Sequence, residues 1–216
     1  MQLSFNLDTK DDTPIILLNQ TKKPVELKEI PDSYIVTDVE TTGLNPYHDI
    51  IIELCALKII ENKIVDEFST LIKPDRIIPD FIVNLTGITN EEALNGKTKR
   101  KALIDYCNFL GTFPIVGHNV KFDLSFINSA LEKEFGQKLK NDFLDTLFFA
   151  RKKYTNLTSH KLVNIAKFLN IDTKNAHRAL KDCKMTFEII QDIKKAKLQN
   201  NIWHLVYQIQ LNLSVK

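Results

Sequence analysis

Residues 33–72 read SYIVTDVETTGLNPYHDIIIELCALKIIENKIVDEFSTLI and contain three apolar segments separated by short polar links. Tyr34–Glu40, Ile50–Ile60 and Ile64–Ile72 have the apolar and β-branched composition of strands. The link at 61–63 is short enough to be a tight turn. The three segments are therefore predicted to form an antiparallel meander.

Helical periodicity follows this meander. Thr89 and Glu92 have the spacing of a capping box, and Gly136 suits the end of a helix. Helices are predicted from apolar residues spaced three or four apart over Lys99–Leu110, Leu124–Phe135, Thr146–Lys153, Lys161–Leu169 and Ala179–Lys197. Short strands are predicted at Ile115–Gly117 and just before Asp145. The order β-β-β-α-β-α-β-α-α predicts an α/β fold in which helices flank a mixed sheet.

Both ends of the sequence alternate between apolar and polar residues, over 1–8 and again over 207–215. This alternation is typical of half-buried strands. We predict that the two segments pair as a small accessory β element, with pairing between two chains and strand addition to a partner as alternatives. The predicted division is a β-rich N-terminal extension over 1–32, the α/β domain over 33–197 and a C-terminal extension with a terminal strand over 198–216.

Pairing of the two ends within one chain has a measurable consequence. Deletion of residues 207–216 should destabilise the N-terminal extension and leave the rest of the fold unchanged. Hydrogen exchange of residues 1–27 measures this effect, and exchange rates equal to those of the full chain would contradict the pairing.

Composition restricts the kind of protein. The chain has 216 residues, of which 44% are hydrophobic and 26% charged, an ordinary globular balance, and its net charge is only +2. Contact with nucleic acid must therefore come from a local site rather than from bulk charge. Cys55, Cys107 and Cys183 lie too far apart for a zinc motif. No apolar run is long enough for a membrane span and no signal peptide is apparent, so we expect a cytoplasmic protein with reduced thiols.

Two carboxylates share one face of the first strand. Asp38 and Glu40 are two residues apart, so their side chains project from the same side of a strand. Paired negative charge in an apolar setting is costly unless a cation neutralises it. The pair is either a metal site or two solvated residues at a strand end.

Two further clusters carry polar groups. GHNVKFD at 117–123 follows a short apolar strand and places Asp123 near a helix start, where an acidic residue also commonly caps the helix. HRALKD at 177–182 holds His177 and Asp182, which would not share a face of a regular helix. They can reach one site if the histidine precedes the helix; otherwise they are two separate surface residues.

Together, TDVETTGL at 37–44, GHNVKFD at 117–123 and HRALKD at 177–182 resemble the DEDDh family of 3′→5′ exonucleases. This is the ribonuclease-H-like group that includes the proofreading epsilon subunit of bacterial DNA polymerase III. Additional similarity lies in LTGIT at 85–89 and LDTL at 144–147. The resemblance covers about three quarters of the chain and implies a ribonuclease-H-like mixed β-sheet flanked by helices.

The resemblance implies a catalytic role for five residues. Asp38, Glu40, Asp123 and Asp182 would bind two divalent metal ions, and His177 would be the general base that deprotonates the attacking water. Carboxylate oxygens are hard ligands, which favours Mg²⁺ or Mn²⁺ over zinc. Two such ions can activate a water and stabilise the leaving 3′ oxygen. Imidazole, with a pKa near 6.5, suits proton removal at neutral pH.

The resemblance also implies substrate contacts, which are expected at Thr41, Thr42, Leu44, His118, Asn119 and Phe122. The backbone of the two threonines would hold the terminal sugar, and the leucine would wedge between the last bases. The other three would line the pocket of the terminal nucleotide. The leucine is otherwise an ordinary loop residue, and the phenylalanine a core residue.

The expected activity is hydrolysis of the 3′-terminal phosphodiester of single-stranded DNA, with release of nucleoside 5′-monophosphates, in proofreading or repair. A DNA polymerase subunit would be a separate partner, and the sequence does not determine the oligomeric state. One alternative is an exoribonuclease that trims short RNA or RNA 3′ ends. The other is a catalytically silent module that binds nucleic-acid ends or a polymerase. The basic run at 97–101 is interpreted as a solvated helix start, with backbone tracking as its alternative.

Overall fold

The structure of the protein is a computed structural model that describes residues 22–195. The predicted terminal strands at 1–8 and 207–215, and their pairing, lie outside the described residues. The described part of the predicted β-rich extension forms an isolated bridge rather than a strand, in which Glu26 pairs with Phe143. The amide of Leu27 donates to the carbonyl of Phe143 at 2.7 Å and fixes this segment to the edge of the sheet.

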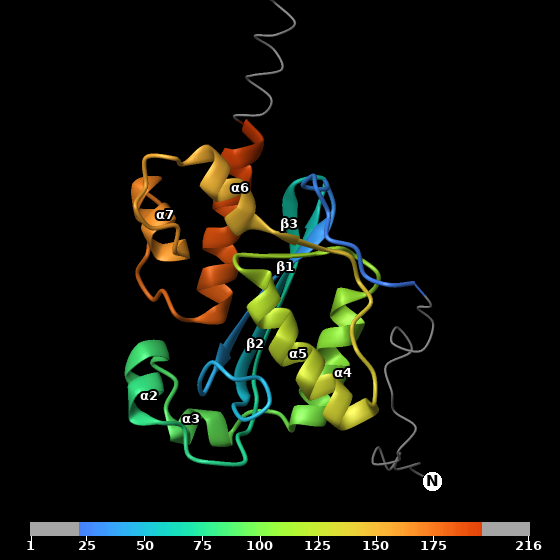
Figure 1. Ribbon diagram of the computed structural model, residues 1–216. Helices are drawn as coiled ribbons and strands as arrows, with labels where there is room; N and C mark the ends of the chain where they lie inside the picture. The colour runs from blue at the N-terminus through green and yellow to red at the C-terminus, as the bar shows by residue number, and fades with distance from the viewer. Residues whose placement is uncertain (1–21, 196–216) are drawn as a thin grey trace, which may run out of the picture.

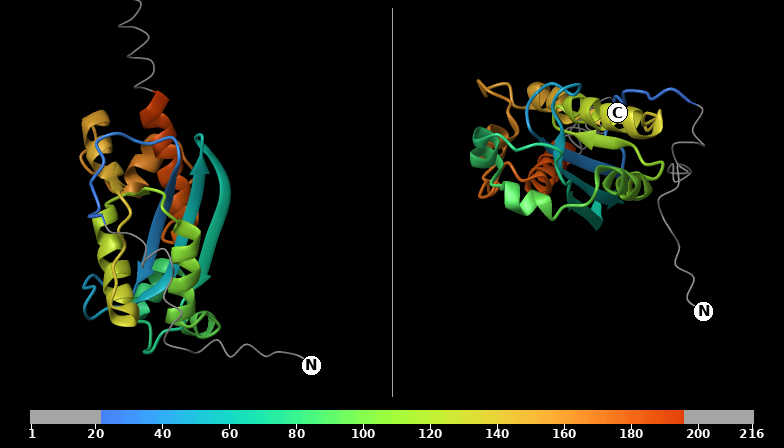
Figure 2. Two further views of the ribbon diagram at one scale, coloured as in Figure 1. Left: turned by 90° about the vertical axis from the view of Figure 1, so that its right-hand side faces the viewer. Right: turned by 90° about the horizontal axis from the view of Figure 1, so that it is seen from below.

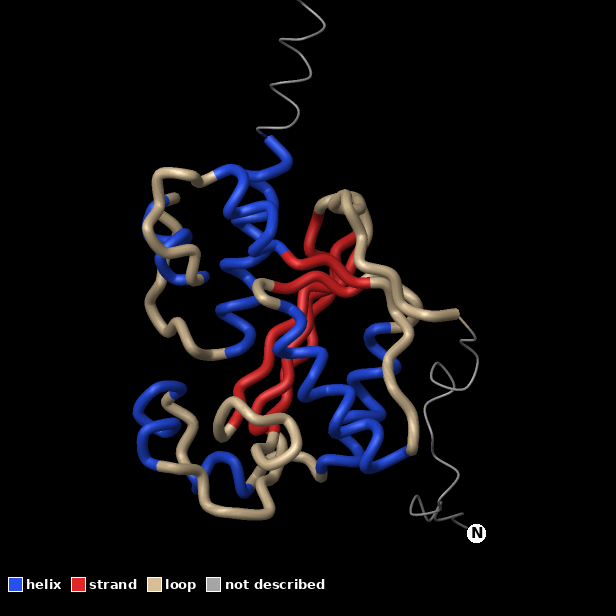
Figure 3. Tube along the Cα trace, viewed as in Figure 1, coloured by secondary structure: helices blue, strands red, loops and turns tan. Residues whose placement is uncertain are grey.

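A five-stranded mixed sheet forms the centre of the domain (Figures 1 and 3). Its strand order is β3-β2-β1-β4-β5; β1, β2 and β3 are antiparallel neighbours, and β4 runs parallel to both β1 and β5. This arrangement confirms the predicted meander and mixed sheet. The strands are β1 (Tyr34–Thr41), β2 (Ile51–Ile60), β3 (Lys63–Leu71), β4 (Ile115–Gly117) and β5 (Phe143–Asp145).

Each of the five helix ranges predicted from periodicity has a counterpart among the helices of residues 22–195. These helices are α2 (Asp80–Thr86), α3 (Asn90–Leu94), α4 (Lys99–Leu110), α5 (Val120–Phe135), α6 (Thr146–Lys153), α7 (Leu162–Phe168) and a last helix over residues 179–195. The capping box of Thr89 and Glu92 is present at the start of α3.

One helix was not predicted and another begins earlier than predicted. The unpredicted helix is α2, which has only seven residues, begins after Pro79 and ends at Gly87 with φ 73°. The start of the helix predicted over Leu124–Phe135 was wrong, because this helix, α5, begins at Val120. Its N-cap is Asn119 in a left-handed conformation, with φ 63°, so the chain turns directly from β4 into the helix.

Helices cover both faces of the sheet (Figure 2), and alternating strand residues pack against them. On one face, Ile35 and Leu54 belong to a core cluster with Leu103 of α4 and Ile127 of α5. The opposite face carries Val36, Cys55 and Leu57, which cluster with Cys183 and Ile190 of the helix over 179–195. Side chains of β1 therefore reach both layers, and the face covered by the last helix also holds Asp38 and Glu40.

The three cysteines are buried and free. Within residues 22–195, no helix combines the length and apolar character needed to cross a membrane.

Gly117 lets α5 approach β1 closely. A Cβ atom at this position would lie 2.8 Å from Val120 Cγ2 and 3.1 Å from the Thr37 carbonyl oxygen. Gly117→Ala should therefore push the first turn of α5 away from the sheet, lowering the free energy of unfolding by about 1–3 kcal/mol and weakening Mn²⁺ binding. Urea denaturation and calorimetric titration with Mn²⁺ measure the two effects.

Gly136→Ala is the matched control at the other end of α5. Gly136 has φ 66° and no atom within 4 Å of an added Cβ, so this variant should lose about 1–2 kcal/mol from backbone strain. Its Mn²⁺ affinity should equal that of the parent. Equal Mn²⁺ affinity in both variants would show that the Gly117 contact does not position the acidic residues.

Candidate metal centre

Three carboxylates converge on the helix-covered face of β1. One oxygen from each of Asp38, Glu40 and Asp182 lies within 4.8 Å of the others. The first two side chains share a face because they are two residues apart on β1, and the third comes from the first turn of the helix over 179–195. Glu40 and Asp182 are buried, whereas Asp38 is half-buried. The fold thus joins residues separated by more than 140 positions.

Asp123 lies beside this trio. It sits in the first turn of α5, is only 3% exposed, and its Oδ1 accepts a hydrogen bond of 3.1 Å from the backbone amide of Val39. That amide lies between the two carboxylates of β1. The predicted metal ligands are therefore neighbours, with the fourth held against the strand that carries the first two.

Crowding and burial make these groups difficult to ionise. Burial, followed by the negative charge of Asp182, raises the pKa of Glu40 to about 8. Burial also raises the pKa of Asp123 to about 8, against the hydrogen bonds it accepts from backbone amides, and that of Asp182 to about 6. The pKa of Asp38 is well above its ordinary value for the same reasons, burial and then the charge of Asp123. A cluster of hard oxygen donors with unneutralised charge suits a divalent cation.

His177 immediately precedes the helix that carries Asp182. It is exposed, has φ 67°, a conformation uncommon for residues other than glycine, and its amide donates to Asp182 Oδ1 at 3.3 Å. This is the arrangement that the sequence required for the two residues to reach one site. The exposed histidine is thus joined to the acidic cluster through its backbone amide.

Glu53 and Arg178 hold this helix start, and the sequence analysis missed both. Glu53 is 2% exposed, accepts a 2.8 Å hydrogen bond from Arg178 Nη2 and caps the helix through the amide of Ala179 at 2.9 Å. In the β1–β2 register Glu53 is the partner of Glu40. The available signal was a single carboxylate within the otherwise apolar segment Ile50–Leu57.

The predicted sugar and base contacts on the β1–β2 link lie at one end of the sheet. Thr41 Oγ1 donates to the Gly43 carbonyl at 2.6 Å, and Thr42 Oγ1 accepts from the Ile50 amide at 3.0 Å. These bonds close a tight loop whose apolar Leu44 is 84% exposed. Leu44 is therefore a loop residue available for contact and not part of the core.

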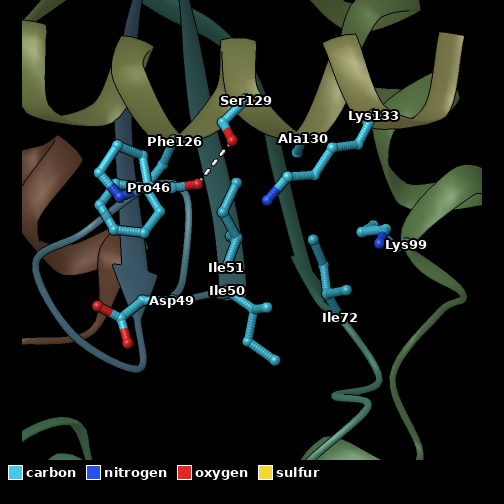
Figure 4. Close-up of a pocket in the computed structure, with 10 residues that line it drawn as sticks. All are labelled: Pro46, Asp49, Ile50, Ile51, Ile72, Lys99, Phe126, Ser129, Ala130 and Lys133. Atoms are coloured by element: carbon cyan, nitrogen blue, oxygen red, sulfur yellow. Dashed lines mark hydrogen bonds between the residues drawn. The ribbon is translucent and has the colours of Figure 1, made fainter.

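The same loop is anchored to α5. Ser129 Oγ donates to the Pro46 carbonyl at 2.6 Å, and a small cavity of about 30 Å³ lies beside this bond, lined by Ile51 and Phe126 among others (Figure 4). A cavity of this size accommodates about one water molecule. The hydrogen bond therefore anchors the loop to α5, and the cavity beside it is too small to be a substrate pocket.

The three predicted pocket residues near α5 occupy different environments. Both ring nitrogens of His118 are engaged, Nδ1 with Thr146 Oγ1 at 3.0 Å and Nε2 with the His160 carbonyl at 2.8 Å, and burial lowers its pKa. Asn119 is exposed, whereas Phe122 is half-buried and its ring centroid lies 5.0 Å from that of Phe126. His118 thus joins the starts of α5 and α6, and Phe122 is partly a core residue.

The basic run at 97–101 has intramolecular partners. Lys97 and Lys101 both pair with Asp105, at 2.6 and 2.8 Å, and Lys99 pairs with Glu134 at 2.9 Å. These pairs agree with the interpretation of the run as a helix start rather than a backbone track.

Sequence comparison relates the chain to nucleases and polymerases. The family model described as Exonuclease (RNase_T) matches residues 35–190. The DNA polymerase III subunit epsilon of Aquifex aeolicus is 32% identical over 188 residues, which cover 86% of this chain and 91% of that protein. The PolC-type DNA polymerase III of Clostridium perfringens is 40% identical over 172 residues, 79% of this chain but only 12% of the polymerase. The chain thus spans about one eighth of the length of such PolC-type relatives.

Solved structures share the fold. The zinc-bound complex of E. coli exonuclease I with single-stranded DNA has a TM-score of 0.69 and 22% identity, covering 82% of this chain and 43% of that one. Exonuclease X in complex with 5′ overhanging duplex DNA has a TM-score of 0.62 and 23% identity, covering 76% of this chain and 92% of that one. The predicted ribonuclease-H-like α/β architecture is confirmed.

The acidic cluster predicts how stability depends on pH. Without metal, the free energy of unfolding should fall as pH rises from about 5 to about 8. Glu40 and Asp123, with pKa values raised to about 8, bind protons more tightly in the folded chain than in the unfolded chain, where carboxyl pKa values are about 4. Their protonation therefore stabilises the fold at low pH, and this contribution is lost as pH approaches 8. Urea denaturation in EDTA across this interval measures the trend.

Two controls identify the source of the trend. Asp123→Asn removes one titrating group and should flatten the profile, and Mn²⁺ should raise the melting temperature more at pH 8 than at pH 5.5. A parent profile without slope in EDTA would contradict the charge crowding described above.

Proposed function

The chain belongs to the RNase_T exonuclease family, and on this premise we propose that it hydrolyses the 3′-terminal phosphodiester of single-stranded DNA and releases nucleoside 5′-monophosphates. The observation that carries the proposal is the convergence of Asp38, Glu40 and Asp182, with Asp123 alongside and the backbone of His177 bonded to Asp182. Metal-dependent hydrolysis at phosphorus needs such a set of oxygen ligands and a base.

The residues present fit a pair of divalent ions. They offer oxygen donors only, and among residues 22–195 no side chain forms an ion pair with them, because the nearby guanidinium of Arg178 is bonded to Glu53. Mg²⁺ or Mn²⁺ held by Asp38, Glu40, Asp123 and Asp182 would supply activation of a water and stabilisation of charge on the leaving 3′ oxygen.

The protein's own groups then have separate tasks. The carboxylates hold their positions because β1, α5 and the last helix are fixed by backbone hydrogen bonds and by Glu53. His177 removes the proton of the attacking water and, being exposed, returns it to solvent. Each cycle shortens the strand by one nucleotide.

The terminal nucleotide would lie against the β1–β2 loop and the start of α5. The exposed Leu44 offers an apolar wedge for the last bases, and Thr41 and Thr42 offer backbone groups for the sugar. Asn119 and Phe122 would border the same pocket, whereas His118 would contribute by holding the helix starts in place.

Relatives support DNA as the substrate and a polymerase as the partner. Those compared above are DNA polymerase III proteins, an exonuclease in complex with single-stranded DNA and an exonuclease in complex with 5′ overhanging duplex DNA. We infer that the protein serves proofreading or repair together with a DNA polymerase. Within this proposal residues 33–197 form the exonuclease domain, and the remaining segments are extensions to it.

Single substitutions test the catalytic assignment. Asp38→Ala should reduce Mn²⁺-dependent release of mononucleotides to background, because a ligand is lost, and His177→Ala should reduce it by about 10²–10⁴-fold, because the base is lost. The assay is single-turnover hydrolysis of a labelled single strand. Asp66→Asn, on the exposed strand β3, is the matched control and should retain parent activity. Parent-like rates in either Asp38→Ala or His177→Ala would contradict the proposed mechanism.

Substrate preference needs its own test. Initial rates on single-stranded DNA and RNA of matched sequence and length should favour DNA. Faster hydrolysis of RNA would instead support the exoribonuclease, and binding without hydrolysis of either strand would support the silent binding module.

A further inference from the structure

The segment over residues 146–171 has an unusual charge composition. It contains five Lys or Arg residues and no Asp or Glu, although the whole chain has a net charge of only +2. The segment comprises α6, α7 and their link, which lie together beside the last helix (Figure 1). Positive charge is thus concentrated in this segment of the chain.

Most of these cations have no ionic partner. Arg151, Lys152 and Lys161 are exposed and form no ion pair with any residue of 22–195. Lys153 differs, because it pairs with Asp192. The basic run at 97–101 provides a contrast, since three of its cations are bound to Asp105 or Glu134. Cations without intramolecular partners are available for phosphates.

An exposed aromatic ring accompanies these cations on α6. Phe148 is 52% exposed, and Lys152 Nζ lies 4.1 Å from its ring centroid. About half of this ring faces water, while its other contact is with the ring of Phe149. A ring with an adjacent cation matches a nucleotide, because the base can stack on the ring while the phosphate meets the charge.

The surface of α6 is joined to the metal centre by one carboxylate. Asp145 Oδ1 accepts hydrogen bonds of 2.9 Å from the amide of Asn119, at the start of α5, and from that of Leu147, at the start of α6. The first turn of α5 carries Asp123. His118 adds a second link, because its ring is bonded to Thr146. The α6 surface therefore begins next to the acidic cluster and leads away from it.

We propose that Phe148, Arg151 and Lys152, which share one face of α6 by their spacing of three and four residues, form a track for the single strand on the 5′ side of the cleaved nucleotide. This α6 track deepens the proposed function and rests on it for the direction of the strand. The bases contact the phenylalanine and the phosphates contact the cations. Recognition is independent of sequence, because every nucleotide offers a ring face and a phosphate.

The test measures binding separately from hydrolysis. A labelled single-stranded DNA of about 20 nucleotides is titrated in EDTA, and its dissociation constant is followed by fluorescence anisotropy at several salt concentrations. Arg151→Gln combined with Lys152→Gln should weaken binding and reduce the slope of log K against log salt by about 0.7 for each lost phosphate contact. Phe148→Ala should weaken binding by about fivefold or more without changing this slope.

Lys97→Gln combined with Lys101→Gln is the matched control, because it removes the same charge from a surface whose cations are already paired. It should keep the parent affinity and slope. Equal losses in the two double variants, or no loss in either, would overturn the α6 track. Failure of the proposed function gives a different result, namely a parent protein that binds the strand through α6 but releases no mononucleotides with Mn²⁺. Circular dichroism confirms that each variant is folded.

Discussion

Crowding of negative charge on one face of β1 is the constraint around which the rest of the domain is organised. Asp38 and Glu40 cannot avoid each other because strand geometry places them on one side, and Asp123 and Asp182 are brought against them by two separate helices. The guanidinium of Arg178 could relieve this repulsion. Its Nε and Nη2 instead donate hydrogen bonds to Glu53, which keeps the guanidinium at the start of the last helix. The fold thus leaves a concentration of negative charge that a divalent cation would neutralise.

Sequence patterns predicted those features that depend on neighbours in the chain. The strands of the meander and the bounds of α4 and α6 follow from local periodicity and from turn and cap residues. The proximity of the carboxylates could also be anticipated, because spacing of two on a strand and a histidine just before a helix restrict where side chains point. The motif resemblance joined these separate clusters into one site.

Other features depend on contacts that no local pattern encodes. The role of Glu53 arises from its pairing with a residue 125 positions away, and Asp145 acquires its role only when two helix starts meet. The start of α5 was misjudged because Asn119 adopts a left-handed conformation that composition does not reveal. The basic run at 97–101 was interpreted as a helix start, but its acidic partners Asp105 and Glu134 could not be assigned from local sequence.

Sharing of Asp145 Oδ1 by two amides has a consequence for how the protein would advance along a strand. The starts of α5 and α6 are held by the same oxygen. In the proposed function, this shared contact would fix the distance between the acidic cluster and the α6 track. With this distance fixed, each newly exposed 3′ end would take the same position at the acidic cluster as the nucleotide removed before it.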